Sequence, residues 1–251
     1  IADGDWSSDV CSSDLESAPG APELGAKRDP ALAREIGREF AQSCKDRGIG
    51  MLLAPVLDVA LPGAPEIIKT RSFGKDRDVV QAIGLAFADG AMQGGVVPIV
   101  KHYPGHGAAK QDSHAGLAVI ELERSEDLAR VLYPFAQAVL AGIPGVMVGH
   151  IAVPRLEEEG QSHRPASLSP RLVREFLRER WNFEGVIVSD DIAMAGAVTG
   201  GSVEKPVGTV WIGLAWRGEA GEGERKGEAV RTAAFHSCLP GSRNVVRDRA
   251  A

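Results

Sequence analysis

The chain has 251 residues, of which 44% are hydrophobic and 25% are charged, and its net charge is −6. This length and apolar content suffice for one substantial core and match a single α/β barrel, which excludes disordered and fibrous classes. An acidic balance without a basic block argues against nucleic acid and an anionic membrane surface as partners. No stretch approaches the roughly 18 apolar residues of a membrane span, and no segment has the pattern of a signal peptide.

The cysteines give little sign of a covalent framework. Cys11, Cys44 and Cys238 are odd in number and widely spaced. This pattern suggests neither a disulfide framework nor a zinc site, and it favours a reducing compartment.

The first 25 residues show no helical or strand period and are rich in Ser, Asp, Gly and Pro, which predicts a flexible tail. Within them, residues 5–15 (DWSSDVCSSDL) resemble a translated DNA-sequencing adapter. On this interpretation residues 1–23 form a non-native or disordered head, to be left out of reasoning about the fold.

Helices and strands are predicted to alternate from Asp29 onward. Asp29 is a good N-cap, and apolar residues recur at helical spacing until Gly48. A buried strand is predicted over residues 51–59. Asp76 caps the next predicted helix, which leads into a strand over residues 96–100.

Two further units of helix and strand follow. A helix over residues 125–140, with a capped and acidic first turn, precedes a strand at 145–148. A helix that opens at Ser169 precedes a strand at 185–188. Four strands separated by helices of this length predict a parallel sheet or barrel with right-handed crossovers. Their near-continuous apolar character fits strands buried on both faces.

The composition changes after Val198. The remaining sequence is rich in Gly, Glu, Lys and Arg, with one predicted strand over residues 209–216 and no strongly amphipathic helix after it. A domain boundary, or a join of unrelated sequences, is expected near residues 196–202.

Two short stretches concentrate the residues that are suited to chemistry. The first is residues 101–107 (KHYPGHG) with residues 112–114 (DSH), and the second is residues 189–191 (SDD). Each follows an apolar run, as when a parallel barrel strand delivers catalytic groups to its C-terminal rim. Together they predict an active site.

Six motifs resemble, in order and spacing, those of the bacterial β-N-acetylglucosaminidases of glycoside hydrolase family 3. They are residues 54–59 (APVLDV), 71–74 (RSFG), 101–107, 112–114, 164–169 (RPASLS) and 185–194. The resemblance covers about residues 24–198 and implies the barrel domain of that family. The Asp-Ser-His triplet favours the N-acetylglucosaminidase branch over the β-glucosidases of the same family.

The resemblance implies a retaining hydrolase that acts through a covalent glycosyl-enzyme. Asp190 would attack the anomeric carbon, and His114 would be the acid/base in place of the second carboxylic acid of many retaining enzymes. Asp112 would hold that imidazole in one tautomer and stabilise its protonated form. An imidazole pKa near 6.5 suits both roles near neutral pH.

The resemblance also implies a set of substrate-binding residues. Arg71, Lys101 and His102 match positions that bind the sugar's hydroxyls and acetamido group, where cations and imidazole donate hydrogen bonds. His150 is a further candidate at the rim. No metal or organic cofactor is implied.

Four other residues keep plainer interpretations. Asp58 is either a loop cap or a substrate contact, and Asp191 is interpreted as a structural partner for backbone amides in preference to the nucleophile. His106 is structural, in a Pro-Gly-His-Gly turn, and His163 is a solvated loop residue.

The sequence departs from the family pattern at both ends. The family's first two strands, with a sugar-gripping Asp-Gln-Glu-Gly-Gly-type motif, and its last strands are missing as family sequence. Residues 199–251 instead resemble a fragment of the amidase domain of competence/damage-inducible nicotinamide-nucleotide amidases. The expected fold is therefore α/β, a partial (β/α)8 TIM-type barrel with an unrelated C-terminal fragment. A chimeric chain of low stability and little activity is expected, because such a barrel cannot close.

The leading functional interpretation is a β-N-acetylhexosaminidase of peptidoglycan recycling in the cytoplasm. Its substrate would be a small saccharide of the N-acetylglucosaminyl-anhydromuramyl type. Alternatives are a glycoside phosphorylase of the same family, an inert or noncatalytic sugar-binding remnant and, from the tail alone, a nicotinamide-nucleotide amidase. The sequence does not indicate an oligomeric state.

Overall fold

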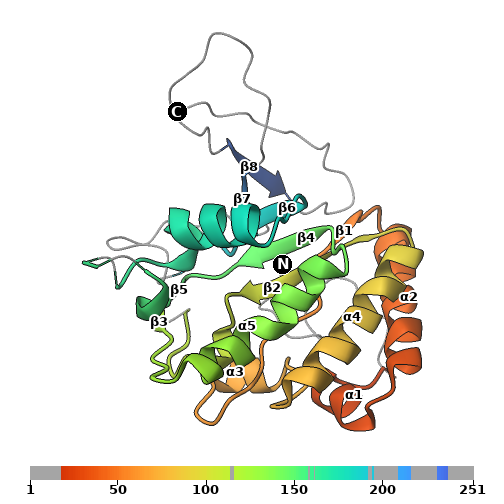
Figure 1. Ribbon diagram of the computed structural model, residues 1–251. Helices are drawn as coiled ribbons and strands as arrows, with labels where there is room; N and C mark the ends of the chain where they lie inside the picture. The colour runs from red at the N-terminus through yellow and green to blue at the C-terminus, as the bar shows by residue number, and fades with distance from the viewer. Residues whose placement is uncertain are drawn as a thin grey trace.

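A computed structural model of the protein describes residues 18–113, 116–157, 159–160, 162–191 and 194, and the backbone of residues 209–215 and 231–236. Its main sheet has the strand order β1-β2-β4-β6-β7-β8 (Figure 1). The parallel strands are β1 (Met51–Leu52), β2 (Val97–Tyr103), β4 (Gly145–Val148) and β6 (Val186–Ser189). The predicted α/β class with a parallel sheet is confirmed.

Helices connect these strands and cover the sheet. They are α1 (Ala21–Lys27), α2 (Pro30–Asp46), α3 (Glu66–Lys69), α4 (Arg77–Gln93), α5 (Ser125–Leu140) and η4 (Arg171–Arg180), the last with π-type hydrogen bonds. The 3-10 turns are η1 (His106–Ala108), η2 (Pro154–Leu156) and η3 (Ala166–Leu168). Two short strands, β3 (Ala118–Val119) and β5 (Ile151–Ala152), pair in parallel apart from the main sheet. Figure 1 shows α2, α4 and α5 side by side along one face of the sheet.

Both faces of the parallel strands are apolar. Most buried apolar residues form one core between the sheet and the helices. Ile99, Met147 and Val188 form a second, smaller cluster. They alternate along the strands with residues of the first core, so they lie on the opposite face of the sheet. This confirms the predicted burial on both faces.

Helices α2 and α4 approach each other closely at two glycines. A Cβ atom at Gly37 would lie 2.1 Å from the carbonyl oxygen of Phe87, and one at Gly90 would lie 1.9 Å from that of Arg34. Only glycine fits these two positions without moving a backbone. The rings of Phe40 and Phe87 meet edge to face beside them, with centroids 5.5 Å apart.

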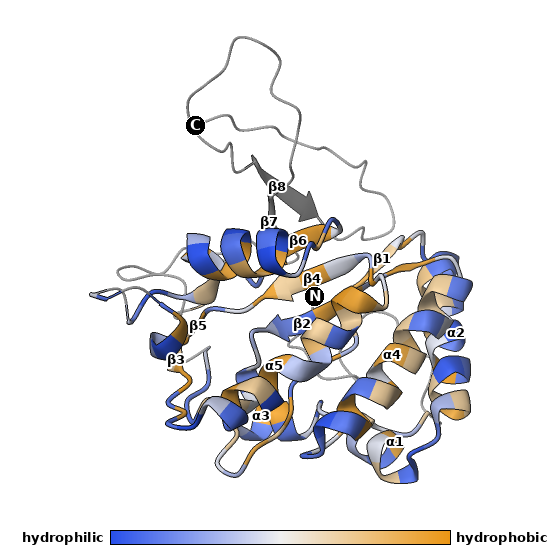
Figure 2. Cartoon of the chain, in the orientation of Figure 1, coloured by the Kyte–Doolittle hydropathy of each residue, from blue (hydrophilic) through white to orange (hydrophobic). Residues whose placement is uncertain are grey.

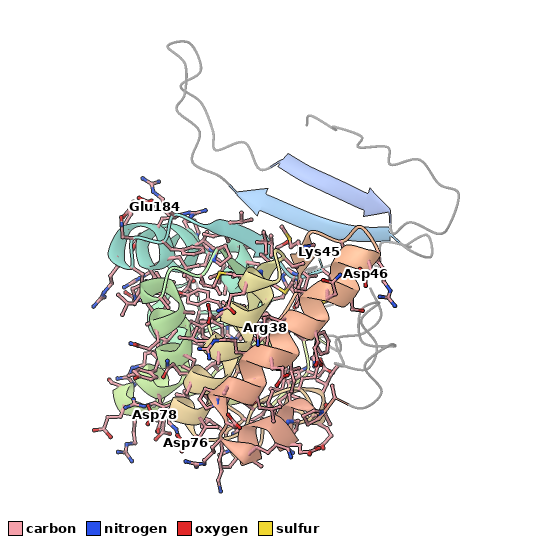
Figure 3. All side chains as sticks on the ribbon, turned by 90° about the vertical axis from the view of Figure 1, so that its right-hand side faces the viewer. Arg38, Lys45, Asp46, Asp76, Asp78 and Glu184 are labelled. Carbon is pink, nitrogen blue, oxygen red and sulfur yellow. The ribbon has the colours of Figure 1, made fainter. Side chains whose placement is uncertain are left out.

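The predicted helix starts are confirmed at two aspartates. Asp29 caps α2, where its Oδ1 accepts from the N–H groups of Ala31 (2.9 Å) and Leu32 (3.1 Å). Asp76 caps α4 by accepting from the N–H of Asp78 at 3.0 Å. Figure 3 shows Asp76 and Asp78 at the edge of the molecule. The cap predicted for the helix at residues 125–140 is wrong, because its N-cap residue is Arg124, whose side chain makes no capping hydrogen bond.

Regular structure also begins earlier in the chain than predicted. The sequence predicts a flexible tail through residue 25, but α1 begins at Ala21. Proline in the first turn fits a helix start, and burial of Leu24 holds the helix against the core. Of the predicted head at residues 1–23, residues 1–17 lie outside the described residues, and the prediction is wrong for residues 21–23, which belong to α1.

The strand predicted over residues 51–59 is regular only in β1. Pro55 has no amide hydrogen to donate, which interrupts the ladder. The segment nevertheless stays beside β2, because the N–H of Leu57 donates to the carbonyl of Lys101 at 2.6 Å and the N–H of Lys101 donates to the carbonyl of Pro55 at 3.1 Å. This pairing carries Asp58 to the end of the sheet.

The strand predicted over residues 209–216 is present as β7 (Thr209–Ala215). It pairs antiparallel with β6 and with β8 (Arg231–His236), so the sheet is mixed beyond β6. The rest of the predicted C-terminal fragment lies outside the described residues.

Cys44, buried on α2, forms a disulfide bond that the cysteine spacing does not predict. The other two cysteines, Cys11 and Cys238, both lie outside the described residues. Within the described part of the chain, no helix is long and apolar enough to cross a bilayer.

Candidate active site

The carboxyl ends of the four parallel strands meet at one edge of the sheet. Asp58 follows the β1 segment, and Lys101 and His102 lie near the end of β2. His150 follows β4, and Asp190 follows β6. Figure 2 shows β2 turning hydrophilic toward its end, whereas β4 beside it is mostly hydrophobic. The topology thus brings together residues that are up to 132 positions apart in the sequence, from 58 to 190.

Backbone hydrogen bonds hold the strand ends in register. The N–H of Gly149 donates to the carbonyl of Tyr103 and the N–H of Asp190 donates to the carbonyl of Val148, each at 2.9 Å. The chain therefore leaves β4 and β6 at fixed positions, and His150 and Asp190 are the first titratable residues beyond them.

Asp58 is the buried centre of this edge. Its Oδ1 accepts from the backbone N–H of His106 at 2.6 Å, and its Oδ2 lies 2.7 Å from the ring Nδ1 of His102. Burial raises the pKa of Asp58 to about 6, against the opposing effects of His106, Arg71 and the donated hydrogen bonds. Because Asp58 has no exposed surface, the structure favours an internal anchor over a substrate contact.

The hydrogen bond to Asp58 fixes the chemistry of His102. Burial holds the pKa of His102 well below its usual range; the charge of Asp190 acts the other way, and Arg71 and Lys101 lower the pKa further. The ring is therefore neutral near pH 7. With Nδ1–H donated to the Asp58 carboxylate, Nε2 presents a lone pair. His102 thus offers a hydrogen-bond acceptor, which differs from the donor expected from the sequence.

The two predicted cationic contacts lie beside His102. Arg71 and Lys101 are both buried, and the charges of both act on the pKa of His102. The Nε of Arg71 donates to the carbonyl of Ile67 at 2.7 Å, which fixes the guanidinium after α3. The structure thus places all three predicted sugar-binding residues together.

His150 holds the chain segment that follows β6. Its Nε2 lies 3.1 Å from the carbonyl oxygen of Asp191, and its Nδ1 lies 2.6 Å from Oγ of Ser167. Burial lowers the pKa of His150, and the charge of Asp190 acts the other way. In the neutral ring Nε2–H donates to Asp191, and Nδ1 accepts from the Ser167 hydroxyl. The sequence points to His150 only as a rim residue; its partner Ser167 lies unrecognised inside the RPASLS motif.

Asp190 lies where its charge reaches both neighbouring strand ends. It is half-buried, and its Oδ1 accepts from the N–H of Asp191 at 2.9 Å. It acts on the pKa of both His102 and His150. In these contacts Asp191 participates through its backbone groups.

The loop after β2 is fastened by His106. Its Nε2 lies 2.8 Å from Oγ of Ser113 and also accepts the Ser113 backbone N–H at 3.3 Å. The structural interpretation of His106 is supported. Asp112 is half-buried beside Ser113, whereas His114 lies outside the described residues. His163 is exposed, as predicted.

The arrangement is suited to attack on an electrophilic carbon. It combines a carboxylate at a strand end, cations beside it, and neutral imidazoles held in defined tautomers. In the described part of the chain, no group of three or more His, Cys, Asp or Glu side chains is placed to hold a metal ion.

Comparison with known proteins agrees with this geometry. Residues 10–210 match the family described as "Glycosyl hydrolase family 3 N terminal domain". The β-hexosaminidase of Methylococcus capsulatus is 36% identical over 179 residues, which are 71% of this chain and 52% of that protein. The chain spans about half the length of the curated relatives it matches.

Solved structures give the same result. The glycoside hydrolase family 3 β-N-acetylglucosaminidase from Paenibacillus superposes with a TM-score of 0.67 at 35% identity, covering 71% of this chain and 34% of that one. The β-N-acetylhexosaminidase from Beutenbergia cavernae superposes with a TM-score of 0.65 at 30% identity, covering 74% of this chain and 55% of that one. The family resemblance carried by the six sequence motifs is confirmed. The chain belongs to glycoside hydrolase family 3, whose N-terminal domain it contains.

Proposed function

We propose that the protein is a retaining β-N-acetylhexosaminidase that releases β-linked N-acetylglucosamine from small saccharides. The observation that carries the proposal is the position of Asp190, a half-buried carboxylate whose charge acts on imidazoles at both neighbouring strand ends. Relatives and neighbours that bear the names β-hexosaminidase and β-N-acetylglucosaminidase support the same chemistry. We assign the activity to residues 24–198, apart from the head at 1–23 and the C-terminal segment at 199–251.

Asp190 is the nucleophile in this proposal. The N–H of Asp191 occupies Oδ1, so Oδ2 is the oxygen that attacks the anomeric carbon. The bond from that carbon to the leaving oxygen breaks as the new ester bond forms. Water then attacks the same carbon and restores the carboxylate, so two inversions give net retention.

His114 and Asp112 supply the proton chemistry. The His114 imidazolium protonates the leaving oxygen in the first step, and the neutral ring accepts a proton from water in the second. Asp112, two residues earlier, stabilises the imidazolium and selects the tautomer. A histidine serves both steps because its ordinary pKa lies near neutral pH.

Arg71, Lys101 and His102 bind the sugar. Arg71 and Lys101 donate to its oxygens, and Nε2 of His102 accepts from one hydroxyl. The substrate that we propose is the N-acetylglucosaminyl-anhydromuramyl saccharide of cell-wall turnover, processed in the cytoplasm.

The test is turnover of a chromogenic β-N-acetylglucosaminide by the whole chain, whose activity is expected to be low, so each variant is compared with the unaltered chain. Asp190→Asn should abolish turnover, whereas Asp78→Asn, the same change on the exposed start of α4, should leave it unaltered. NMR of the released sugar should show the β-anomer first. Release of the α-anomer, or full activity in Asp190→Asn, would contradict the proposal.

Two further outcomes identify the alternatives. Turnover that requires inorganic phosphate and yields a sugar phosphate would identify a phosphorylase. A folded chain that binds N-acetylglucosamine without turnover would identify a noncatalytic sugar-binding protein. Circular dichroism and a calorimetric titration with the sugar distinguish the second outcome from simple misfolding.

A further inference from the structure

We propose that His106 is a positioning residue, which fastens the loop after β2 through Ser113 and so sets where Asp112 and His114 act. The inference rests on the proposed function for the roles of Asp112 and His114. The fastening itself rests on the contacts of His106 and Ser113, which lie in the described part of the chain.

The backbone that carries His106 is held in place by hydrogen bonds and close packing. His106 opens η1, is almost fully buried, and donates its backbone N–H to Asp58 at 2.6 Å. The next residue, Gly107, accepts from the N–H of Leu61 at 3.0 Å. A Cβ atom at Gly107 would lie 2.3 Å from the carbonyl oxygen of Val59, so η1 is packed directly on the β1 segment. The imidazole of His106 therefore starts from a backbone that cannot shift.

The imidazole of His106 contacts Ser113 of the loop at two atoms. Nε2 accepts from the backbone N–H of Ser113 at 3.3 Å and lies 2.8 Å from its Oγ. Because the amide hydrogen points at Nε2, this nitrogen carries the lone pair and the ring proton is on Nδ1. Two contacts to one residue fix both the position and the orientation of the backbone there. Ser113 is 1% exposed and is flanked in the sequence by Asp112 and His114.

One nitrogen of the His106 ring makes no such contact. Nδ1 of His106 is buried and has no hydrogen-bond partner within the described residues. An unpaired buried N–H is unfavourable, so part of the gain from gripping Ser113 is offset.

Asp58 joins this fastening to sugar binding. One of its oxygens accepts from the backbone of His106 and the other from the ring of His102. The two histidine rings meet edge to face, with centroids 6.0 Å apart. The sugar contact and the base of the loop thus share one buried carboxylate.

Hydrogen exchange tests the fastening without any substrate. In the whole chain, His106→Phe keeps a ring in place but removes the acceptor. The Ser113 amide should exchange at least 10-fold faster in the variant, while the Lys101 amide, bonded to Pro55, should keep its protection. Equal exchange of the Ser113 amide in both proteins would overturn the proposal. Loss of protection at Lys101 as well would also overturn it, because it would show that His106 supports the fold as a whole.

Leaving-group dependence tests the positioning role. Ser113→Ala removes only the hydroxyl contact. It should lower kcat/KM at least 10-fold for methyl β-N-acetylglucosaminide, whose leaving oxygen needs a proton, and less than 3-fold for the 2,4-dinitrophenyl glycoside, which does not. Ser43→Ala, a buried serine on α2, should change neither value.

An equal fall on both glycosides would overturn the positioning role, since it would reflect general damage. If the unaltered chain hydrolyses neither glycoside, the proposed function fails. The exchange measurement then still decides whether His106 fastens the loop.

Discussion

The contact between α2 and α4 and the strand-end site are built in opposite ways. At the helix contact, Gly37 and Gly90 let two backbones touch and aromatic rings fill the space beside them. At the strand ends, Asp58, His102 and His106 are buried although each is polar and titratable. Close apolar packing lowers the free energy of the fold, whereas burial of titratable groups raises it unless hydrogen bonds compensate. Stability and chemistry are therefore located in different parts of the molecule, and substitutions should separate them.

The largest stability effect is expected at Phe87. This side chain is fully buried on α4, so Phe87→Ala should lower the free energy of unfolding by about 4 kcal/mol, through lost apolar contact and the remaining cavity. Urea unfolding measures this loss, and Leu140→Ala, at an exposed leucine, should stay within about 0.5 kcal/mol of the unaltered protein. A fall in kcat of the still-folded Phe87→Ala protein would contradict the separation of stability from chemistry.

The second effect is a pH dependence that originates at Asp58. Burial raises its pKa from 3.8 to about 6, so as the pH rises through this interval the unfolded chain releases its proton before the folded chain does. The free energy of unfolding should therefore fall between pH 4 and 6, by about 3 kcal/mol, and level off above.

Asp58→Asn does not titrate and supplies the control. The stability of the unaltered protein relative to this variant should decline across that interval, as measured by urea unfolding at half-unit steps of pH. His102, present in both proteins, contributes the opposite slope, because burial lowers its pKa and the unfolded chain takes up a proton first below pH 6.5. A difference that is constant with pH would show that Asp58 does not titrate abnormally.

The third effect separates activity from stability at His150. His150→Phe keeps a ring but removes the hydrogen bonds to Ser167 and to the backbone of Asp191. Under the proposed function, kcat should fall about 10-fold with little change in KM, because the nucleophile's segment is displaced. Steady-state kinetics measures both constants. A rise in KM alone would instead make His150 a direct sugar contact.

The smallest effect on stability is expected at the N-cap of α2. Asp29→Ala removes the cap of α2 and should lower the free energy of unfolding by about 1 kcal/mol, without any change in kcat. Asp46→Ala, at the exposed end of the same helix, is the matched control and should have little effect (Figure 3). Equal losses in the two variants would show that the Asp29 cap contributes nothing specific.

Features encoded locally were predicted well from the sequence. Asp29 and Asp76 cap helices because a capping side chain and its amides lie within three residues. The strand ends were also predictable, since parallel strands place their carboxyl ends at one edge. The sequence alone therefore predicts that Lys101, His102 and Asp190 lie close together.

Features that depend on distant partners were not predictable in the same way. The tautomer of His102 is set by Asp58, 44 positions earlier, and the segment with Asp191 is held by His150, 41 positions before it. Helix α1 was missed because a seven-residue helix has too little periodicity to detect, and burial of Leu24 stabilises it. In each case the deciding interaction is tertiary.

The single carboxylate shared by two histidines has a consequence for engineering and for divergence within the family. Under the proposed function, a change at His102 that alters sugar recognition also alters the charge and geometry at Asp58, and Asp58 accepts from the backbone N–H of His106, before the loop that carries Asp112 and His114. Substitutions at His102 and Ser113 should therefore combine non-additively, although no direct contact is needed between them. A variant with a new ligand preference would therefore need compensating changes in the loop that follows His106.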